Sequence, residues 1–199
     1  MQNSLRQRPP AILLVLAAVA VVVSLAPLSY LAIRLTEFGA DKVLANVIRP
    51  RTLELLGNSL LLTLAVSVSA VAIGGFQAWL TTRTSIRGRA VFAILAALPL
   101  AMPSYVSAYA FTALFTGFRG FAAAWLVLTI GTAPYVYLAV SAALLRADSA
   151  TEEVARSLGA GRWRVFRQIT WPAIRPAAIS GAMLSALYTL SDFGAVSIL

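Results

Sequence analysis

Long apolar stretches separated by short charged segments make up this sequence. Four stretches carry no charged residue and a fifth carries one; they are 9–33, 55–82, 90–118, 120–145 and 176–199. A helix needs about 20 apolar residues to cross the hydrocarbon core of a bilayer, so each stretch is long enough. The stretches are rich in Ala and Leu and lack the two-residue alternation of a membrane barrel, which favours helices over strands.

The pattern therefore predicts an all-α membrane protein in which residues 1–199 form a single transmembrane domain. We expect about five membrane-spanning helices, at 9–33, 58–82, 90–114, 120–145 and 176–199. Between them we expect an external loop at 34–57 and a cytoplasmic loop at 146–175. The first stretch follows Arg6 and Arg8 as a secretion signal would, but it is too long for one and continues past any cleavage-like site, so we interpret it as a retained span.

Composition agrees with this class. The chain is 60% hydrophobic and 12% charged, with a mean hydropathy of +0.84, whereas soluble domains are nearer one quarter charged. The net charge of +9 fits basic cytoplasmic loops better than nucleic-acid binding. The chain has no His and no Cys, which removes the usual metal ligands, the thiol nucleophiles and the commonest general base.

The distribution of basic residues predicts the orientation. Eleven of the 16 Lys and Arg residues fall at the N-terminus, near 83–89 and in 146–175, and the other five fall in the alternate segments. Because Lys and Arg concentrate in cytoplasmic loops, we expect the N-terminus and the loop 146–175 to be cytoplasmic.

The longest charged passage, EEVARSLGAGRWRVFRQITWP at 152–172, lies in this loop. Its first part predicts a short helix, Gly159 and Gly161 predict a turn, and WRVFRQI predicts a second helix. Pro172 and Pro176 mark the entry into the last span. The passage is either an amphipathic loop among lipid head groups or a docking element for a cytoplasmic partner.

The spacing within this passage resembles the EAA loop of ABC importer permeases. That family's form is Glu-Ala-Ala, three residues, Gly, nine residues and Ile-x-Leu-Pro. Here the matching positions are Glu153, Ala155, Gly159, Ile169 and Pro172. Two positions depart from the form, since Val154 replaces the first Ala and Trp171 replaces the Leu.

Other stretches agree with the resemblance. The helix that opens at Asn58 is similar to the first helix of a permease core, while LPLAMPSYVSAYAF and LSDFGAVSIL look like the iron(III)-type permeases. Those proteins are often two fused halves. The resemblance implies a helical bundle of the MetI-like, type I transmembrane-domain class in a bacterial inner membrane. It also implies that this chain is most of one amino-terminal half, a fragment that ends at or just after its fifth span.

The resemblance further implies a permease subunit that forms a translocation path and catalyses no reaction. No Walker A pattern occurs in the chain, so ATP would be used by a separate ABC ATPase dimer, and this chain would bind no cofactor. In the family, residues at the positions of Glu153, Ala155, Gly159, Ile169 and Pro172 couple the permease to that ATPase. The other implied partners are an extracytoplasmic solute-binding protein, a second permease half and the lipid membrane, with no nucleic acid. The implied cargo is iron(III), although related permeases carry thiamine, sulfate, other oxyanions or polyamines.

Asp192 is the acidic residue that lies well inside a predicted span, which makes it a candidate for the substrate path. Tyr105, Tyr109 and Ser191 are further candidates for that path. Alternatively, these side chains satisfy helix–helix packing or a backbone group. Rival interpretations of the whole chain are a secondary transporter or channel without an ATPase, an intramembrane enzyme, and an assembly protein that only anchors a partner.

Overall fold

The computed structural model describes residues 11–38, 47–147 and 149–199, and the described residues contain helices and no strands. The expected external loop 34–57 lies partly outside these residues. In chain order the elements are α1 (Ala11–Phe38), α3 (Pro50–Arg83), α4 (Arg89–Ala97), η1 (Leu98–Ala101), α5 (Ser104–Leu114), α6 (Phe121–Arg146), α7 (Ser149–Ser157), α8 (Arg162–Val165), η2 (Phe166–Thr170), α9 (Trp171–Ser191) and α10 (Gly194–Ile198).

The chain divides into two units, Met1–Leu56 and Gly57–Leu199. The first contains α1, whose apolar stretch Ile12–Arg34 has the length and composition of a membrane span. Its described side chains are exposed on every side, which suits a helix surrounded by lipid. At the end of this stretch the Arg34 guanidinium donates to the Tyr30 hydroxyl at 3.1 Å, a pair typical of a membrane–water boundary.

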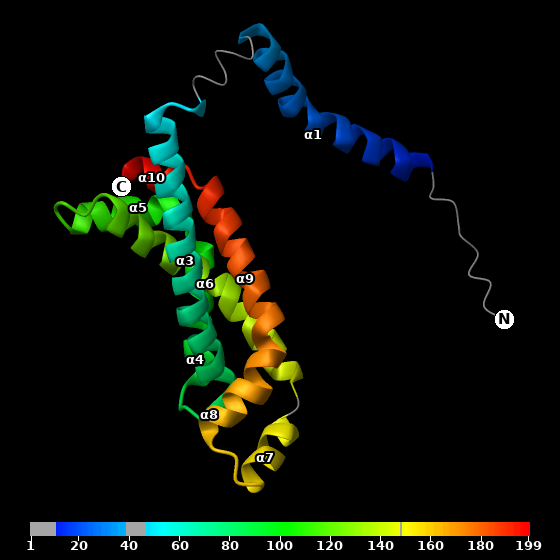
Figure 1. Cartoon of the computed structure of the whole chain (residues 1–199), viewed down its shortest axis with the longest axis vertical. Coiled ribbons are helices and arrows are strands. Elements are labelled where there is room, and N and C mark those ends of the chain that lie inside the picture. Colours follow the sequence, from blue (N-terminus) through cyan, green and yellow to red (C-terminus); the bar gives the residue numbers. More distant parts are fainter. Residues whose placement is uncertain (1–10, 39–46, 148) are drawn as a thin grey trace. The chain divides into compact units, whose positions relative to one another are not determined.

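Helix α6 is the centre of the second unit. It packs along α9 on one side and against the apolar part of α3 on another (Figure 1). Val136, Val140 and Leu144 on α6 are fully buried. They form a core with Ala70 and Ala78 of α3 and with Ile174 and Ala178 of α9. In the bilayer, where apolar side chains gain nothing by leaving lipid, such packing depends on close fit between helices.

Two glycines allow that fit. A Cβ on Gly74 of α3 would meet the carbonyl oxygen of Ala133 and lie 2.9 Å from the backbone nitrogen of Tyr137. A Cβ on Gly181 of α9 would lie 2.7 Å from the Cα of Val136. Both distances are shorter than any side chain tolerates, so α3 and α9 approach the backbone of α6 because these two positions have no side chain.

The span expected at 90–114 is not a straight helix. Helices α4 and α5 meet there at 98°, joined by η1. Pro103 supplies the physical reason, because a residue before proline is driven out of the helical region, and Met102 is extended (φ −107°, ψ 123°). The hydrophobic pattern predicted one span here and gave no sign of this change of direction.

The helix expected at 176–199 begins earlier and ends earlier. Residues 162–191 form a continuous helical run, in which the π-helical turn η2 precedes Pro172. Pro172 lacks the N–H that an α-helix would use and its ring crowds the preceding turn, which a wider turn accommodates. The run stops at Asp192, which is extended (ψ 104°), and α10 then begins.

By length and composition, three described helices could cross a membrane, or four if the α4–α5 pair counts as one span. These are the apolar stretch of α1, α3 and α6, whereas α9 does not reach the same hydropathy. The count of five spans and their boundaries therefore stay predictions.

The glycine contacts give a test of the packing. We expect Gly74→Ala to destabilise the protein by about 1–3 kcal/mol, because the added methyl group must push α3 away from the α6 backbone. The measurement is the thermal unfolding midpoint in detergent, monitored by tryptophan fluorescence. Gly75→Ala is the matched control, since a Cβ there meets nothing within 4 Å. Equal midpoints for the two variants would contradict the proposed close contact.

Candidate functional site

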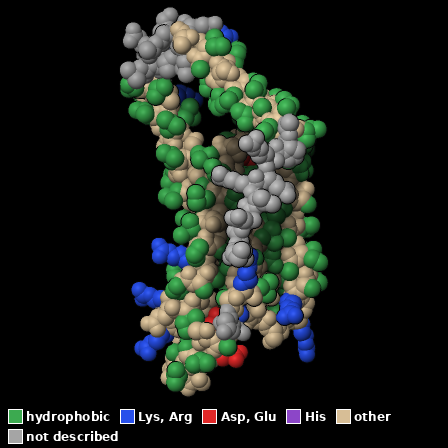
Figure 2. All heavy atoms as spheres, turned by 90° about the vertical axis from the view of Figure 1, so that its right-hand side faces the viewer, with side chains coloured by type: hydrophobic (Ala, Val, Ile, Leu, Met, Phe, Trp, Pro, Cys, Tyr) green, Lys and Arg blue, Asp and Glu red, His purple; other side chains and the backbone are tan. Residues whose placement is uncertain are grey.

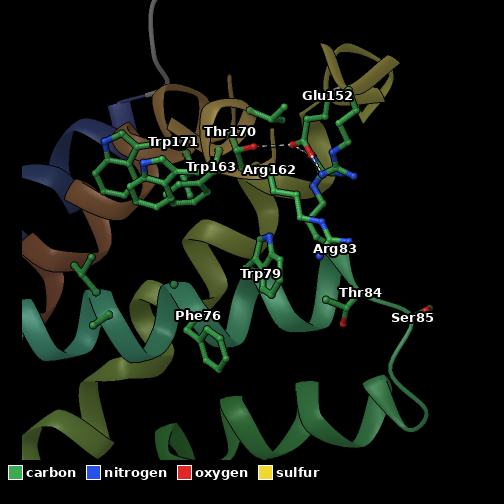
Figure 3. Close-up of a pocket in the computed structure, with 17 residues that line it drawn as sticks. Phe76, Trp79, Arg83, Thr84, Ser85, Glu152, Arg162, Trp163, Thr170 and Trp171 are labelled. Atoms are coloured by element: carbon green, nitrogen blue, oxygen red, sulfur yellow. Dashed lines mark hydrogen bonds and ion pairs between the residues drawn. The ribbon is translucent and has the colours of Figure 1, made fainter. Parts of the chain in front are cut away.

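The polar end of the second unit is built around one buried acid, Glu152 of α7. Its side chain is 9% exposed and its Oε1 accepts a hydrogen bond from the Thr170 hydroxyl at 3.0 Å. Arg83 lies 3.5 Å from the same oxygen, and Arg156, one turn further along α7, lies 3.6 Å from Oε2. These four residues are called the Glu152 network below (Figure 3).

The Glu152 network joins four segments. Arg83 is the last residue of α3, Glu152 and Arg156 belong to α7, and Thr170 ends η2. Arg83 also donates to the carbonyl oxygen of Ala147, directly after α6, at 3.2 Å. A carboxylate withdrawn from water is costly unless it is paired, and here two guanidinium groups and a hydroxyl compensate it. These interactions therefore hold α7 against the ends of the long helices α3 and α6.

The opposite face of α7 points away from the bundle. Glu153 is exposed, as are the apolar side chains of Val154 (58%) and Leu158 (82%), which lie one turn apart. Ala155 is half-buried. Figure 2 shows basic side chains gathered around this end of the second unit, with acidic side chains among them. The outer face of α7 therefore presents one acid and two apolar side chains within a basic surface.

Gly159 ends α7 in a way that needs a glycine. Its φ is +85°, in the left-handed region that side chains disfavour. The N–H of Gly159 donates to the carbonyl oxygen of Arg156, and the N–H of Ala160 donates to that of Ala155, both at 3.0 Å. This is the Schellman arrangement, in which a left-handed glycine satisfies the last helical carbonyls. It turns the chain from α7 toward α8.

The structure brings the two ends of the predicted coupling segment together. Ile169 is half-buried in η2 and Pro172 is exposed in the first turn of α9. Their neighbour Thr170 forms the hydrogen bond to Glu152, next to the exposed Glu153. The segment 152–172 is therefore a closed unit in which α7 packs on α8 and η2.

Comparison with known proteins now decides the family. Residues 70–199 match the family described as binding-protein-dependent transport system inner membrane component. The molybdenum transport system permease protein ModB of Escherichia coli is 36% identical over 157 residues, which cover 69% of this chain and 69% of that protein. This chain belongs to the binding-protein-dependent permease family.

Further relatives differ in the cargo that their names give. The Fe(3+)-transport system permease protein FbpB 2 of Haemophilus influenzae is 36% identical over 97% of this chain, which spans only 38% of that protein. The sulfate transport system permease protein CysT of Escherichia coli is 30% identical, over 86% of this chain and 68% of the protein. A crystal structure of an amino acid ABC transporter with histidines has a TM-score of 0.52 at 22% identity, over 70% of this chain and 67% of that chain, which shows a shared fold.

In this permease the candidates for the substrate path lie around the two breaks in the helices. Tyr105 and Tyr109 of α5 are exposed (55% and 70%), and Ser191 is exposed at the end of α9. A Cβ on Gly194 would lie 3.1 Å from the Cβ of Tyr105, so the start of α10 packs against Tyr105. The structure thus brings Tyr105 near the 191–194 break. Tyr109 lies one turn further along α5.

Asp192 has a structural partner. It is half-buried, and its Oδ1 accepts a hydrogen bond of 2.8 Å from the backbone N–H of Ala195, which caps the first turn of α10. The structure therefore agrees with the interpretation that Asp192 satisfies a backbone group. Its second carboxylate oxygen is not used in this cap. Within the residues that the structure describes, no group of three or more His, Cys, Asp or Glu side chains could hold a metal ion.

Sequence reasoning missed two features of the permease. The first is the Glu152 network, because the sequence offered two adjacent acids and the family form pointed to Glu153. The second is a cavity of about 170 Å³ beside the α4–α5 break, where Pro99 and Met102 lie near Tyr135 of α6 and Tyr188 of α9. Residues 152 and 155, the more buried positions of α7, lie on one side of the helix, but only the folded structure identifies that side as the inner one.

The Glu152 network can be tested against its neighbour in sequence. We expect Glu152→Gln to lower stability by about 1.5–3 kcal/mol, because hydrogen bonds to a charged group are lost and Arg83 keeps a poorly compensated charge. The readouts are the unfolding midpoint in detergent and the rate of tryptic cleavage after Arg156, which should rise as α7 loosens. Glu153→Gln is the matched control and should change neither. If both variants behaved alike, Glu152 would have no special structural role.

Proposed function

We propose that this chain forms the membrane-spanning path of an ATP-driven, binding-protein-dependent importer, and that the outer face of α7 docks on a separate cytoplasmic ABC ATPase. The observation that carries the proposal is the two-sided character of α7. Its inner face is fastened to the bundle through Glu152, whereas its outer face leaves Val154 and Leu158 exposed beside Glu153. Apolar side chains displayed on a short polar helix gain by being covered by a partner.

The geometry of the loop supports a coupling role. A partner that moved α7 would move the end of α3, because Arg83 is held by both Glu152 and the Ala147 carbonyl. It would also move α9, because the helical run 162–191 leads from the loop into the bundle without a break. ATP, hydrolysed by the partner, would drive the cycle, provided that the partner binds the two states of the permease with different affinity.

The orientation is part of the proposal. An ATPase is cytoplasmic, so the loop 146–175 and the N-terminus would face the cytoplasm of a bacterial cell and the spans would lie in its inner membrane. The distribution of basic residues supports this direction. The remaining proposed partners are an extracytoplasmic solute-binding protein, which would deliver cargo from the other side, and a second permease half.

We propose iron(III) as the cargo. The support is the match to the Haemophilus influenzae Fe(3+) permease, which reaches over 97% of this chain, against 69–87% for the sulfate and molybdenum permeases. Oxyanions are the competing class of cargo, because the sulfate permease CysT and the molybdenum permease ModB are 30% and 36% identical to this chain. Uptake of labelled iron, sulfate and molybdate by cells that carry the full transporter would distinguish them, and uptake of an oxyanion in place of iron would refute the assignment.

A substitution in the turn tests the docking. We expect Gly159→Asp to reduce co-purification of the ATPase about tenfold or more, which corresponds to a loss of about 1.4 kcal/mol of binding, while membrane insertion stays intact. The reason is that the aspartate must adopt the left-handed backbone conformation of this turn and places a charge beside Leu158. The measurement is the amount of ATPase recovered with the tagged permease.

Gly88→Asp is the control for backbone strain. Gly88 also has a left-handed backbone (φ +81°) and open space around it, but it lies in the turn before α4, outside the coupling segment. This variant should keep its ATPase. Unchanged co-purification by Gly159→Asp, or an equal loss in both variants, would count against docking at this turn.

A second substitution tests the substrate path. We expect Asp192→Asn to lower cargo uptake to about a tenth while the assembled transporter forms normally. Asparagine keeps an oxygen that can accept the Ala195 N–H, so the cap of α10 survives and only the charge is removed. Ser197→Ala, an exposed change on the same helix, is the control. Normal uptake by the Asn variant would leave Asp192 with its capping role alone.

A further inference from the structure

A groove of about 890 Å³ lies between α3 and the helical run 162–191, beside the Glu152 network. Its aromatic residues come from both sides, Phe76 and Trp79 from α3 and Trp163, Phe166 and Trp171 from the run. Figure 3 shows Trp79 directed from α3 toward the loop, with Trp163 and Trp171 at one end of the groove and Glu152, Arg83 and Arg162 at the other. One end is therefore apolar and the other is charged.

The aromatic wall is continuous and open to a ligand. The rings of Trp163 and Phe166 stack with centroids 5.7 Å apart, and those of Phe166 and Trp171 lie 6.4 Å apart. Trp163 is 71% exposed and Trp79 is 41% exposed. Three of the four tryptophans of the chain line this groove. Tryptophan prefers the boundary between hydrocarbon and head groups, so a groove with this lining suits that depth of a membrane.

The charged end is cationic. Arg83, Arg156 and Arg162 line it with a single acid, Glu152, which leaves a net charge of +2. The Glu152 carboxylate already accepts Thr170 and pairs with Arg83 and Arg156. The Nε of Arg83 is buried without a hydrogen-bond partner, and Arg162 makes no ion pair with any described residue. The guanidinium groups at this end therefore still have N–H donors available for an anion.

We propose that this groove binds an anionic phospholipid of the cytoplasmic leaflet, with its phosphate between Arg83 and Arg162 and an acyl chain along the aromatic wall. Basic pockets between helices on the cytoplasmic side are suited to such head groups. An apolar helix of another subunit would cover the tryptophans but would leave the guanidinium groups uncompensated. The choice of leaflet rests on the cytoplasmic orientation proposed above, but binding of the lipid does not rest on coupling to an ATPase.

The experiment uses quenching of tryptophan fluorescence by brominated lipids. The full chain carries Trp125→Phe, so that the emission comes from the three groove tryptophans, and it is titrated in detergent with brominated phosphatidylglycerol or brominated phosphatidylcholine. We expect saturable quenching that favours phosphatidylglycerol. In Arg162→Gln the lipid concentration for half-maximal quenching should rise about fivefold, the effect of one basic residue near an anionic head group. Arg164→Gln, an exposed neighbour on α8 outside the groove, should leave it unchanged.

Three results would overturn the proposal. Equal quenching by the two lipids would mean that the groove is part of the general lipid shell. Tryptophans shielded from both lipids would mean that protein fills the groove. Equal shifts in the Arg162 and Arg164 variants would mean that overall charge, and not this site, attracts the lipid. Circular dichroism of each variant verifies that the helices are retained, and a conservative Arg162→Lys should recover part of the affinity.

Discussion

One end of this protein, which we propose to be cytoplasmic, is organised by the pairing of one buried carboxylate with basic and hydroxyl groups. Glu152 is withdrawn from water at the point where three long helices end, and an unpaired buried charge there would cost about 3–5 kcal/mol. Arg83 can reach it only because α3 ends at that residue, and Thr170 can reach it only because η2 returns to α7. The position of the loop, the exposure of the outer face of α7 and the cationic end of the groove all follow from this pairing.

The same pairing separates two tasks within one short helix. Residues that face inward hold α7 in place, and residues that face outward remain available for contact with a partner. A helix of nine residues has too few hydrogen bonds to be stable alone, so its shape depends on tertiary contacts and on the glycine turn that ends it. Of the two adjacent acids, Glu152 faces inward and is paired, whereas Glu153 is exposed.

Much of the architecture could be predicted from sequence because hydrophobic length and proline chemistry are local properties. The all-helical membrane class came from hydrophobic length, the turn at Gly159 from its glycines, and the family resemblance from the spacing of residues in 152–172; the family is confirmed by the comparisons. The 98° bend at Met102–Pro103 and the π-helical turn before Pro172 were not foreseen, since a proline indicates a disturbance but not its size. Glu152 was missed because its role depends on Arg83, which is 69 residues away in the sequence and meets it only after folding.

The contacts of Gly74 and Gly181 with α6 have a mechanical consequence. Both helices meet the α6 backbone within the same short segment, Ala133–Tyr137, so this segment is a common pivot. On α3 the pivot lies nine residues from Arg83 and 17 from Gly57, which are lever arms of about 14 and 26 Å at 1.5 Å per residue. A tilt of α3 about that point would displace Gly57 in the opposite direction and about twice as far as the end that carries Arg83.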